Sequence, residues 1–449
     1  MNRTIFRQYD IRGLVDIDLT PDIVRDLGRG IGTMMRSQGL KRMTLGWDAR
    51  LSGPVYRDAI TEGLISTGMD VIQLGMCATP NFYFSIHHLQ MDGGVMITGS
   101  HNPPEFNGFK VNVGDKSIYG EEIQDLYRII EKGEFATGEG KVKQYDILPD
   151  YIDFLTNAFS IERPLRVALD AGNGTAGLTA PAIFKNLGCV TYELFSEPDG
   201  NFPNHHPDPT IPEFIETLRD NVIQKSLDFG VAYDGDSDRI GVIDENGRII
   251  WGDELMVIFS RDILRKNPGA AIIAEVKSSQ RLYDDIAANG GVPIMWKTGH
   301  SLIKSKMKEE GALLAGEMSG HIFFNDRYFG YDDAIYASLR LAEIVSRSDK
   351  PLSEYLADLP KSYSTPEIRF ECPEEKKFEI VERVVKYFKD AGYDVNDIDG
   401  VRLNIGDGWG LLRASNTQPV LVMRFEAQSL EKLEEIKSLI ENKLDEFFA

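Results

Sequence analysis

Three carboxylates at alternate positions mark residues 233–239, which read YDGDSDR. They directly follow the apolar run Phe229–Tyr233, and such neighbouring charges repel one another unless a cation holds them. Oxygen ligands without His or Cys favour Mg²⁺, Mn²⁺ or Ca²⁺ over zinc. The segment therefore predicts a site for a hard divalent cation, with Asp234, Asp236 and Asp238 as ligands.

Two other kinds of site share part of this pattern. An EF-hand loop would place Glu245 at position twelve, but its sixth position should be glycine and is Arg239, and the flanking runs predict strands instead of helices. A haloacid-dehalogenase-type phosphohydrolase ends a strand in Asp-x-Asp, and Asp234 and Asp236 match that pattern with Asp234 as nucleophile. The EF-hand is excluded, whereas the phosphohydrolase remains an alternative.

A second segment, 98–104 (TGSHNPP), follows the apolar run Val95–Ile97. Ser100 stands there between a glycine and a turn-forming Asn-Pro pair, which predicts a tight and accessible loop. Ser100 is thus a candidate nucleophile, with a purely structural hydroxyl as the alternative. Ten residues further along, Lys110 is either a proton carrier beside the carboxylates or an ordinary surface lysine.

Two further segments suit a phosphorylated sugar, and a plain polar turn is the alternative for the first of them. Residues 413–419 (RASNTQP) place a guanidinium before hydroxyl and amide side chains, a set of donors that fits phosphate. Residues 316–321 (GEMSGH) hold a carboxylate and a hydroxyl that could bind sugar hydroxyls. By contrast, residues 172–177 (GNGTAG) match the dinucleotide-binding pattern GxGxxG, but Asp170 just before them would crowd a pyrophosphate.

The elements that carry these segments alternate between short β-rich runs and helical stretches, which predicts parallel or mixed sheets covered by helices. Near the C-terminus, strands separated by a short turn predict an antiparallel sheet instead. Expected strands are 43–47, 70–74, 93–97, 165–170, 189–195, 270–276, 292–296, 401–405, 410–414 and 420–427; expected helices are 56–67, 120–131, 178–186, 280–288, 377–391 and the stretch from 429 onward.

The chain of 449 residues is long enough for about three domains at roughly 150 residues each, and the pattern of elements favours four. We expect an α/β fold with three consecutive α/β domains with mixed sheets and a smaller C-terminal α+β domain. The expected boundaries are 1–146, 147–248, 249–360 and 361–449.

Composition narrows the function classes. Lys and Arg total 49 and Asp and Glu total 70, a formal net charge of −21, and without a basic stripe this disfavours nucleic-acid binding. Three isolated cysteines, Cys77, Cys189 and Cys372, favour a reducing compartment. The sequence shows neither a signal segment nor an apolar window long enough for a bilayer. We expect a cytoplasmic protein with no nucleic-acid or membrane partner.

Five segments in this order make the chain similar to the α-D-phosphohexomutases, and most closely to their phosphomannomutase/phosphoglucomutase branch. They are 6–13 (FRQYDIRG), 98–103, 234–239, 316–321 and 413–419. The resemblance spans nearly the whole chain and implies four domains around a central cleft. In chain order these domains would supply the phosphoserine, metal-binding, sugar-binding and phosphate-binding loops.

The resemblance implies a role for each matching residue. Ser100 would be the phosphoserine, and its phosphate would complete the shell of one Mg²⁺ held by Asp234, Asp236 and Asp238. Lys110 would be the general acid/base. The other catalytic residues implied are Arg12, His101 and Arg239, and the substrate-binding residues are Tyr9, Lys277, His300, Glu317, Ser319, His321, Arg413, Ser415, Asn416 and Thr417.

The activity implied is the reversible interconversion of hexose 6-phosphate and hexose 1-phosphate, with mannose or glucose as the sugar. Phosphorylated Ser100 would form hexose 1,6-bisphosphate, the activator and intermediate. The implied partner is the phosphosugar, and the protein would be a monomer or weak homo-oligomer. Phosphoglucosamine mutase activity is an alternative, but that branch usually has Ala and Gln where this chain has Gly99 and Met318, so it is the lesser one. A non-enzymatic cation- or sugar-binding module is a further alternative.

Overall fold

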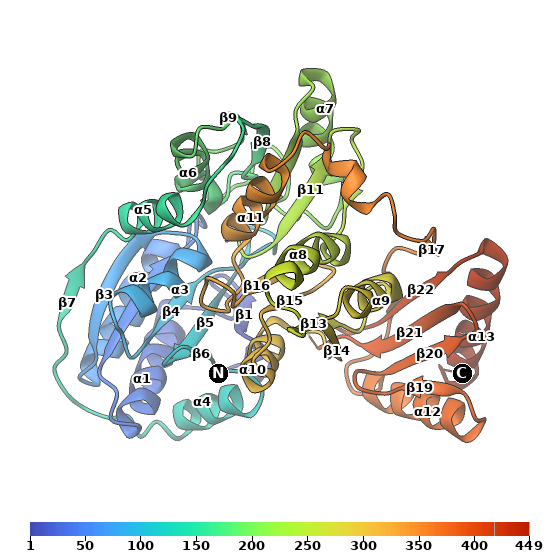
Figure 1. Ribbon diagram of the computed structural model, residues 1–449. Helices are drawn as coiled ribbons and strands as arrows, with labels where there is room; N and C mark the ends of the chain where they lie inside the picture. Colours follow the sequence, from blue (N-terminus) through green and yellow to red (C-terminus); the bar gives the residue numbers. More distant parts are fainter. Residues whose placement is uncertain (417, 449) are drawn as a thin grey trace.

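The computed structural model describes residues 1–416 and 418–448, and it folds into four units, each built on one sheet (Figure 1). The first sheet has the order β1-β5-β4-β2-β3-β7, with β6 paired to β5. Strands β2, β3, β4 and β7 are parallel, whereas β5 is antiparallel to β4 and β1. Its elements are η1 (Arg3–Ile5), β1 (Ile11–Leu14), α1 (Pro21–Ser37), β2 (Arg42–Trp47), α2 (Gly53–Ser66), β3 (Asp70–Met76), α3 (Thr79–His88), β4 (Gly93–Ile97), β5 (Phe106–Val113), β6 (Lys116–Ser117), α4 (Glu121–Lys132) and β7 (Val142–Gln144).

The second sheet, of order β12-β11-β10-β8-β9, is also mixed, because β8 is parallel to β9 and β10 while β11 is antiparallel to β10. Strand β10 ends immediately before the three aspartates, which therefore lie in the turn to β11. The elements are α5 (Leu148–Ala158), β8 (Arg166–Asp170), η2 (Thr175–Leu178), α6 (Ala180–Asn186), β9 (Val190–Leu194), η3 (Pro212–Ile215), α7 (Glu216–Lys225), β10 (Phe229–Tyr233), β11 (Ile240–Asp244) and β12 (Ile249–Ile250).

The third sheet has the order β14-β13-β15-β16, with β13 parallel to both neighbours and β16 antiparallel to β15. The turn between β15 and β16 carries the segment with Glu317 and Ser319. The elements are α8 (Gly252–Lys266), β13 (Ala271–Glu275), α9 (Gln280–Ala288), β14 (Val292–Trp296), α10 (His300–Glu310), β15 (Leu314–Gly316), β16 (Ile322–Phe324), α11 (Ala334–Ser346) and η4 (Leu352–Leu356).

The fourth sheet is antiparallel throughout, in the order β17-β22-β21-β20-β19 with β18 also paired to β22. Helices α12 and α13 lie beside it at the C-terminal end of the molecule (Figure 1). The elements are β17 (Tyr363–Ser364), β18 (Ile368–Glu371), α12 (Lys377–Asp390), β19 (Asp394–Asn396), β20 (Val401–Ile405), β21 (Gly408–Ala414), β22 (Val420–Ala427) and α13 (Leu430–Phe448).

One hydrophobic core extends through the second and third units, whereas most of the first unit and the fourth unit have cores of their own. Helix α11 is buried along its whole length and packs with α8 between the second and third sheets, which explains its apolar sequence on all sides. Residues of α3 in the first unit join the same core. The separate core of the fourth unit is formed by its sheet and by α12 and α13. The fourth unit can therefore move relative to the other three at a smaller cost in buried apolar surface.

The structure confirms the α/β fold class, with three mixed sheets followed by a smaller antiparallel α+β unit. The short strands β17, β18 and β19 were not expected, because runs of 2, 4 and 3 residues are too short to be distinguished from loops in the sequence. The GNGTAG segment is not arranged for a dinucleotide. Its first glycine, Gly172, donates its N–H to Asp170 at 2.9 Å, and Asp170 also binds His205, so the carboxylate occupies the turn where a pyrophosphate would lie.

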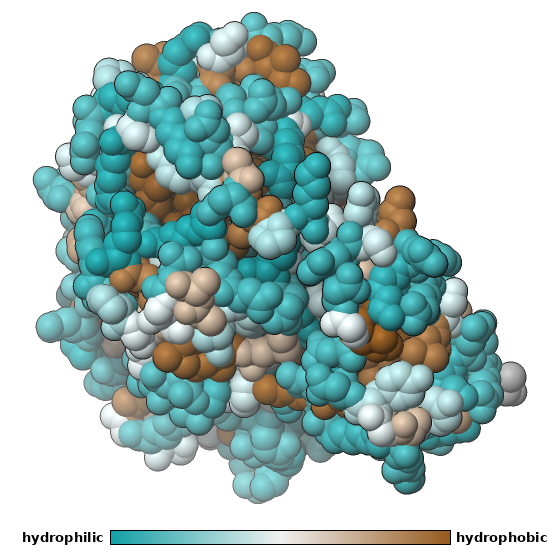
Figure 2. Space-filling view, turned by 45° about the vertical axis from the view of Figure 1, so that its right-hand side comes forward, coloured by the Kyte–Doolittle hydropathy of each residue, from teal (hydrophilic) through white to brown (hydrophobic). Residues whose placement is uncertain are grey.

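The surface in Figure 2 is mainly hydrophilic, with apolar side chains in small separate patches. This matches the excess of acidic residues in the sequence. Within residues 1–416 and 418–448, no helix is both long and apolar enough to cross a membrane.

Candidate active site

Ser100 lies at the centre of the site, buried in the loop after β4. Its Oγ donates a hydrogen bond of 2.8 Å to Asp234 Oδ2 and lies 3.0 Å from His101 Nδ1. Ser100 adopts a left-handed backbone conformation with φ 50°, which is uncommon for a residue other than glycine. The strained turn points the hydroxyl from the first unit toward the carboxylates of the second.

Two residues that the sequence analysis missed fix this loop. The buried Arg50 donates to the carbonyl oxygens of four loop residues, at 2.5 to 2.8 Å. Asp48 accepts from Thr98 Oγ1 at 2.8 Å and from Gly99 N at 3.2 Å. A Cβ on Gly99 would lie 2.4 Å from Arg50 Cζ, so an alanine there would require the guanidinium to shift. The signal in the sequence was a charged pair directly after a predicted strand.

The three aspartates expected to hold a cation lie together. Asp234, Asp236 and Asp238 are almost fully buried, and each offers an oxygen within 4.8 Å of the others. In the described part of the chain, Asp236 Oδ1 and Asp238 Oδ1 are buried without a hydrogen-bond partner. Buried carboxylate oxygens are costly unless a proton or cation compensates them, so this all-oxygen donor set fits Mg²⁺.

Lys110, on β5, lies among these carboxylates. Its Nζ donates to Asp236 Oδ2 at 2.7 Å and to Asp238 Oδ2. Burial opposes the charged lysine, but Asp236 and Asp238 outweigh it and raise its pKa well above the ordinary value. Burial, reinforced by the other two carboxylates, raises the pKa of Asp234 well above its ordinary value. A bound divalent cation would offset both effects, because it supplies positive charge at the same place.

The other expected catalytic side chains surround Ser100. Arg12 donates to Asn102 Oδ1 at 2.7 Å and pairs with Asp10 at 2.5 Å. Burial, followed by the charges of Arg239 and Arg12, holds the pKa of His101 well below its ordinary value, so His101 is neutral near neutral pH. Arg239 Nε donates to His321 Nε2 at 2.9 Å, which joins the second unit to the third.

The third unit presents the side chains expected to bind sugar. Glu317 accepts hydrogen bonds from Ser319 Oγ at 3.0 Å and from Gly299 N at 2.9 Å. Each of its two carboxylate oxygens is therefore held by a residue in a loop that follows a strand. Lys277 pairs with Glu367 at 3.0 Å, and this partner lies between β17 and β18 of the fourth unit. Burial lowers the pKa of Lys277, but Glu367 and Glu275 outweigh it and raise the pKa above the ordinary value.

The fourth unit supplies the expected phosphate clamp. Arg413 pairs with Asp399 at 2.9 Å, and Asn416 donates to Tyr9 Oη at 2.6 Å. Ser415 Oγ accepts from Gln418 N at 3.2 Å. Thr417, the last expected member of the clamp, lies outside the described residues.

A continuous series of contacts joins the carboxylates to the clamp. His321 Nδ1 lies 3.6 Å from Asp238, and its ring stacks on that of His300 with centroids 5.6 Å apart. The His300 ring lies 5.9 Å from the ring of Tyr9, which is hydrogen-bonded to Asn416. Side chains from all four units therefore lie in one site.

The buried Asp332 and the partly buried Lys304 of the third unit were also missed by the sequence analysis. Asp332, just before α11, pairs with His321 at 3.1 Å and with Lys304 at 3.1 Å. Asp332 lies in no recognisable pattern, and its partners are distant in the sequence, so only the folded structure brings them together.

Comparison with known proteins accounts for this arrangement. Models of the four phosphoglucomutase/phosphomannomutase domains match the chain in order: alpha/beta/alpha domain I at residues 3–137, domain II at 149–247, domain III at 251–363 and the C-terminal domain at 367–443. The chain belongs to the phosphoglucomutase/phosphomannomutase family. It is therefore an enzyme of the mutase type, and the alternatives of an Asp-nucleophile phosphohydrolase and of a non-enzymatic binding module are wrong.

Individual relatives are similar to this chain over nearly its full length. The phosphomannomutase/phosphoglucomutase of Pseudomonas aeruginosa is 46% identical over 441 residues, covering 98% of this chain and 95% of its own. The phosphoglucomutase of Neisseria gonorrhoeae is 46% identical over 442 residues, with 98% and 96% covered. The crystal structure of a phosphoglucomutase/phosphomannomutase family protein from Burkholderia thailandensis superposes with a TM-score of 0.94 at 41% identity, covering 100% of this chain and 98% of its own.

Proposed function

We propose that this mutase interconverts hexose 6-phosphates and hexose 1-phosphates of mannose, glucose or both, through a phosphoserine at Ser100 and a hexose 1,6-bisphosphate. The observation that carries the proposal is the position of Ser100. Its hydroxyl is hydrogen-bonded to Asp234 in a group of buried carboxylates, with Lys110, Arg239 and the neutral His101 around it.

In the proposed reaction, the bond between phosphorus and Ser100 Oγ breaks while a bond forms to the free hydroxyl of the phosphosugar. That hydroxyl gives up its proton while Ser100 Oγ regains one, and we assign both transfers to Lys110, which lies between Asp236 and Asp238. Lys110 must be neutral to accept the sugar proton, and a cation bound by these aspartates would favour that form by lowering the pKa that they raise. The product is a bisphosphate, which turns around and returns its other phosphoryl group to Ser100. Such a transfer depends on positioning and charge neutralisation.

We propose Mg²⁺ as the cofactor, held by Asp234, Asp236, Asp238 and an oxygen of the Ser100 phosphate. When bound, Mg²⁺ supplies positive charge beside the transferring phosphoryl group. On the protein side, Arg12 and Arg239 contribute positive charge on the first and second units. Hexose 1,6-bisphosphate would also act as the activator that phosphorylates Ser100.

The sugar and its second phosphate would be bound by the third and fourth units. We assign Glu317, Ser319 and His321 to sugar hydroxyls, with Lys277 and His300 near the substrate. Arg413, Ser415, Asn416 and Thr417 would bind the phosphate that is not reacting, because a guanidinium with neighbouring hydroxyl and amide donors suits that group. Tyr9 would lie at the entrance of the active site, where its hydroxyl accepts a hydrogen bond from Asn416 and so joins the first unit to the fourth.

Mannose and glucose are favoured over glucosamine. The relatives with high identity are named for phosphomannomutase and phosphoglucomutase activity. Gly99 and Met318 also depart from the residues that phosphoglucosamine mutases usually have at these positions. Phosphoglucosamine mutase activity is therefore the weaker candidate.

Three further proposals concern the protein as a whole. We propose the domain boundaries 1–146, 147–248, 249–360 and 361–449. The cysteines Cys77, Cys189 and Cys372 are all buried and unpaired, which supports a reducing location such as the cytoplasm. We also propose that the protein is a monomer or weak homo-oligomer without nucleic-acid or membrane partners, which fits its net charge.

The proposal is tested by incubating the protein with Mg²⁺, catalytic glucose 1,6-bisphosphate and either glucose 1-phosphate or mannose 1-phosphate. We expect the corresponding hexose 6-phosphate to form without release of inorganic phosphate. Glucosamine 1-phosphate is the comparison substrate, and S100A, which lacks the hydroxyl, is the control. Conversion by S100A at the wild-type rate would contradict the proposal.

A further inference from the structure

Asp332 occupies a position from which it can act on the reacting groups without touching them. Its carboxylate is fully buried and faces basic side chains on two sides. One oxygen accepts from Lys304 Nζ at 3.1 Å, and the other lies 3.1 Å from His321 Nδ1 and 3.8 Å from His300 Nδ1.

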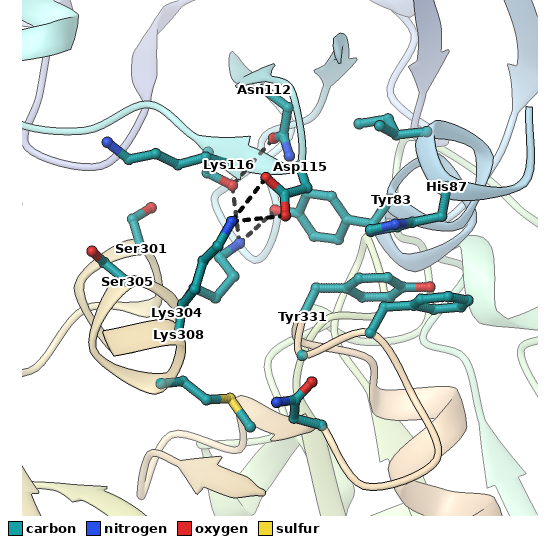
Figure 3. Close-up of a pocket in the computed structure, with 16 residues that line it drawn as sticks. Tyr83, His87, Asn112, Asp115, Lys116, Ser301, Lys304, Ser305, Lys308 and Tyr331 are labelled. Carbon is teal, nitrogen blue, oxygen red and sulfur yellow. Dashed lines mark hydrogen bonds and ion pairs between the residues drawn. The ribbon is translucent and has the colours of Figure 1, made fainter. Parts of the chain in front are cut away.

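Lys304 anchors Asp332 to the first unit. It extends from α10 into a cavity of about 240 Å³ between the first and third units, toward Tyr83 on α3 (Figure 3). There its Nζ lies 3.1 Å from both Tyr83 Oη and Ser117 Oγ. These contacts fix which oxygen of Asp332 faces Lys304, and the other oxygen is thereby directed at His321.

The hydrogen-bond network determines the tautomer of His321. Arg239 has only donors, so His321 Nε2, which receives its Nε–H at 2.9 Å, must be unprotonated. The imidazole proton is then on Nδ1, which lies 3.1 Å from Asp332 Oδ2. The two atoms are not aligned as a regular hydrogen bond, and among the described residues neither has a hydrogen-bond partner elsewhere, so the carboxylate acts on the N–H through its charge. The neighbouring group Asp238, His321 and Asp332 resembles a second metal site, but a protonated Nδ1 cannot be a metal ligand.

We propose that Asp332 is a positioning residue, which holds His321 in the Nδ1–H tautomer so that His321 fixes the orientation of Arg239. With Nε held by His321, the terminal amino groups of Arg239 are the donors left for an oxygen of the transferring phosphoryl group. This inference rests on the proposed function, in which Arg239 neutralises charge at that group.

The substitution D332N separates this role from simple packing. An asparagine has nearly the same shape, and its amide oxygen must face Lys304, which only donates. The amide NH₂ then faces His321 Nδ1 and favours the opposite tautomer, with a proton on Nε2 directed at the N–H of Arg239. An Asp-to-Asn change that reverses a histidine tautomer in this way lowers turnover in serine proteases while leaving the geometry intact.

We expect D332N to lower kcat by about 10- to 100-fold, with KM within about threefold of wild type. The matched control is D333N. Asp333 is also buried, but it caps α11 and binds Tyr151 and Tyr328, so D333N should lose stability and keep its kcat. In addition, D332N should cause little further loss in an H321A background, because the two residues act as one unit.

A direct measurement is the tautomer of His321 by NMR of protein labelled with ¹⁵N-histidine, with the signal assigned by its loss in H321A. We expect the Nδ1–H tautomer in wild type and the Nε2–H tautomer in D332N. An Nε2–H tautomer in wild type, an unchanged tautomer in D332N, or equal loss of kcat in D332N and D333N would overturn the inference. Failure of the wild type to convert phosphosugars would instead refute the proposed function and leave the tautomer result standing.

Discussion

The hydroxyl of Tyr9 accepts a hydrogen bond of 2.6 Å from Asn416 Nδ2, although 407 residues separate the two in the chain. The same hydroxyl donates to the carbonyl oxygen of Thr298 at 2.8 Å. One phenol therefore joins the first, third and fourth units at the edge of the site. Because the fourth unit has its own core, a contact of this kind can set its position relative to the rest.

Removal of this hydroxyl in Y9F should weaken phosphosugar binding more than turnover. The two hydrogen bonds contribute roughly 0.5–1.5 kcal/mol each, which together correspond to a rise in KM of about 5- to 160-fold. Steady-state kinetics with glucose 1-phosphate measure the change. Y56F is the matched control, since the buried Tyr56 donates to Leu19 O far from the site. A Y9F enzyme with unchanged KM would show that the contact has no part in binding.

Addition of Mg²⁺ should stabilise the folded protein through the three aspartates. At a concentration about 100 times the Kd, binding to the native state alone adds about 2.7 kcal/mol to the free energy of unfolding of the affected unit. Thermal unfolding with Mg²⁺ or with EDTA measures the shift. D236N should lose most of it, whereas D170N, at a carboxylate outside the group, should keep it. An equal shift in D236N and wild type would place the cation elsewhere.

G99A should lower the activity. The added Cβ would lie 2.4 Å from Arg50 Cζ, so the guanidinium that holds the Ser100 loop must move. Gly114, at φ 63° with open space around its Cβ position, provides the control, because G114A costs only local backbone strain of about 1–2 kcal/mol. We expect G114A to lower the melting temperature slightly and to keep its kcat. A fully active G99A would mean that the Arg50 contacts do not govern the loop.

The three cysteines should be unreactive in the folded protein. Burial raises the pKa of Cys77 to about 12 and that of Cys189 to about 11, and it raises the pKa of Cys372 as well. At pH 8 these thiols are protonated, and the protonated thiol is a poor nucleophile. A chromogenic disulfide reagent should therefore titrate no thiol rapidly in buffer and three in denaturant. Rapid reaction of one native thiol would contradict this account of their burial.

Much of the site was predictable because its residues lie where strands end. Ser100 after β4 and Asp234 after β10 follow apolar runs that can only be buried strands, and both lie in the loops expected of them. The alternation of strands and helices likewise predicts the mixed sheets. The antiparallel fourth sheet follows from strands too closely spaced for a helical crossover.

The residues that were missed act through partners distant in the sequence. Asp332 is a charged residue without a surrounding pattern, and Arg50 is marked only by its place after a predicted strand. The burial of both depends on contacts that no local rule contains. The carbonyl groups that Arg50 binds lie 50 to 56 residues away. Such residues are found only in the folded structure.

The central claim is that Ser100 carries the phosphoryl group, and phosphate mapping tests it most directly. The protein is incubated with Mg²⁺ and glucose 1,6-bisphosphate and digested, and the modified peptide is located by mass and treated with hydroxylamine. We expect one hydroxylamine-resistant phosphate on the peptide that contains Ser100, and none in S100A. A hydroxylamine-labile phosphate on the peptide with Asp234, or no phosphate on any peptide, would contradict the account.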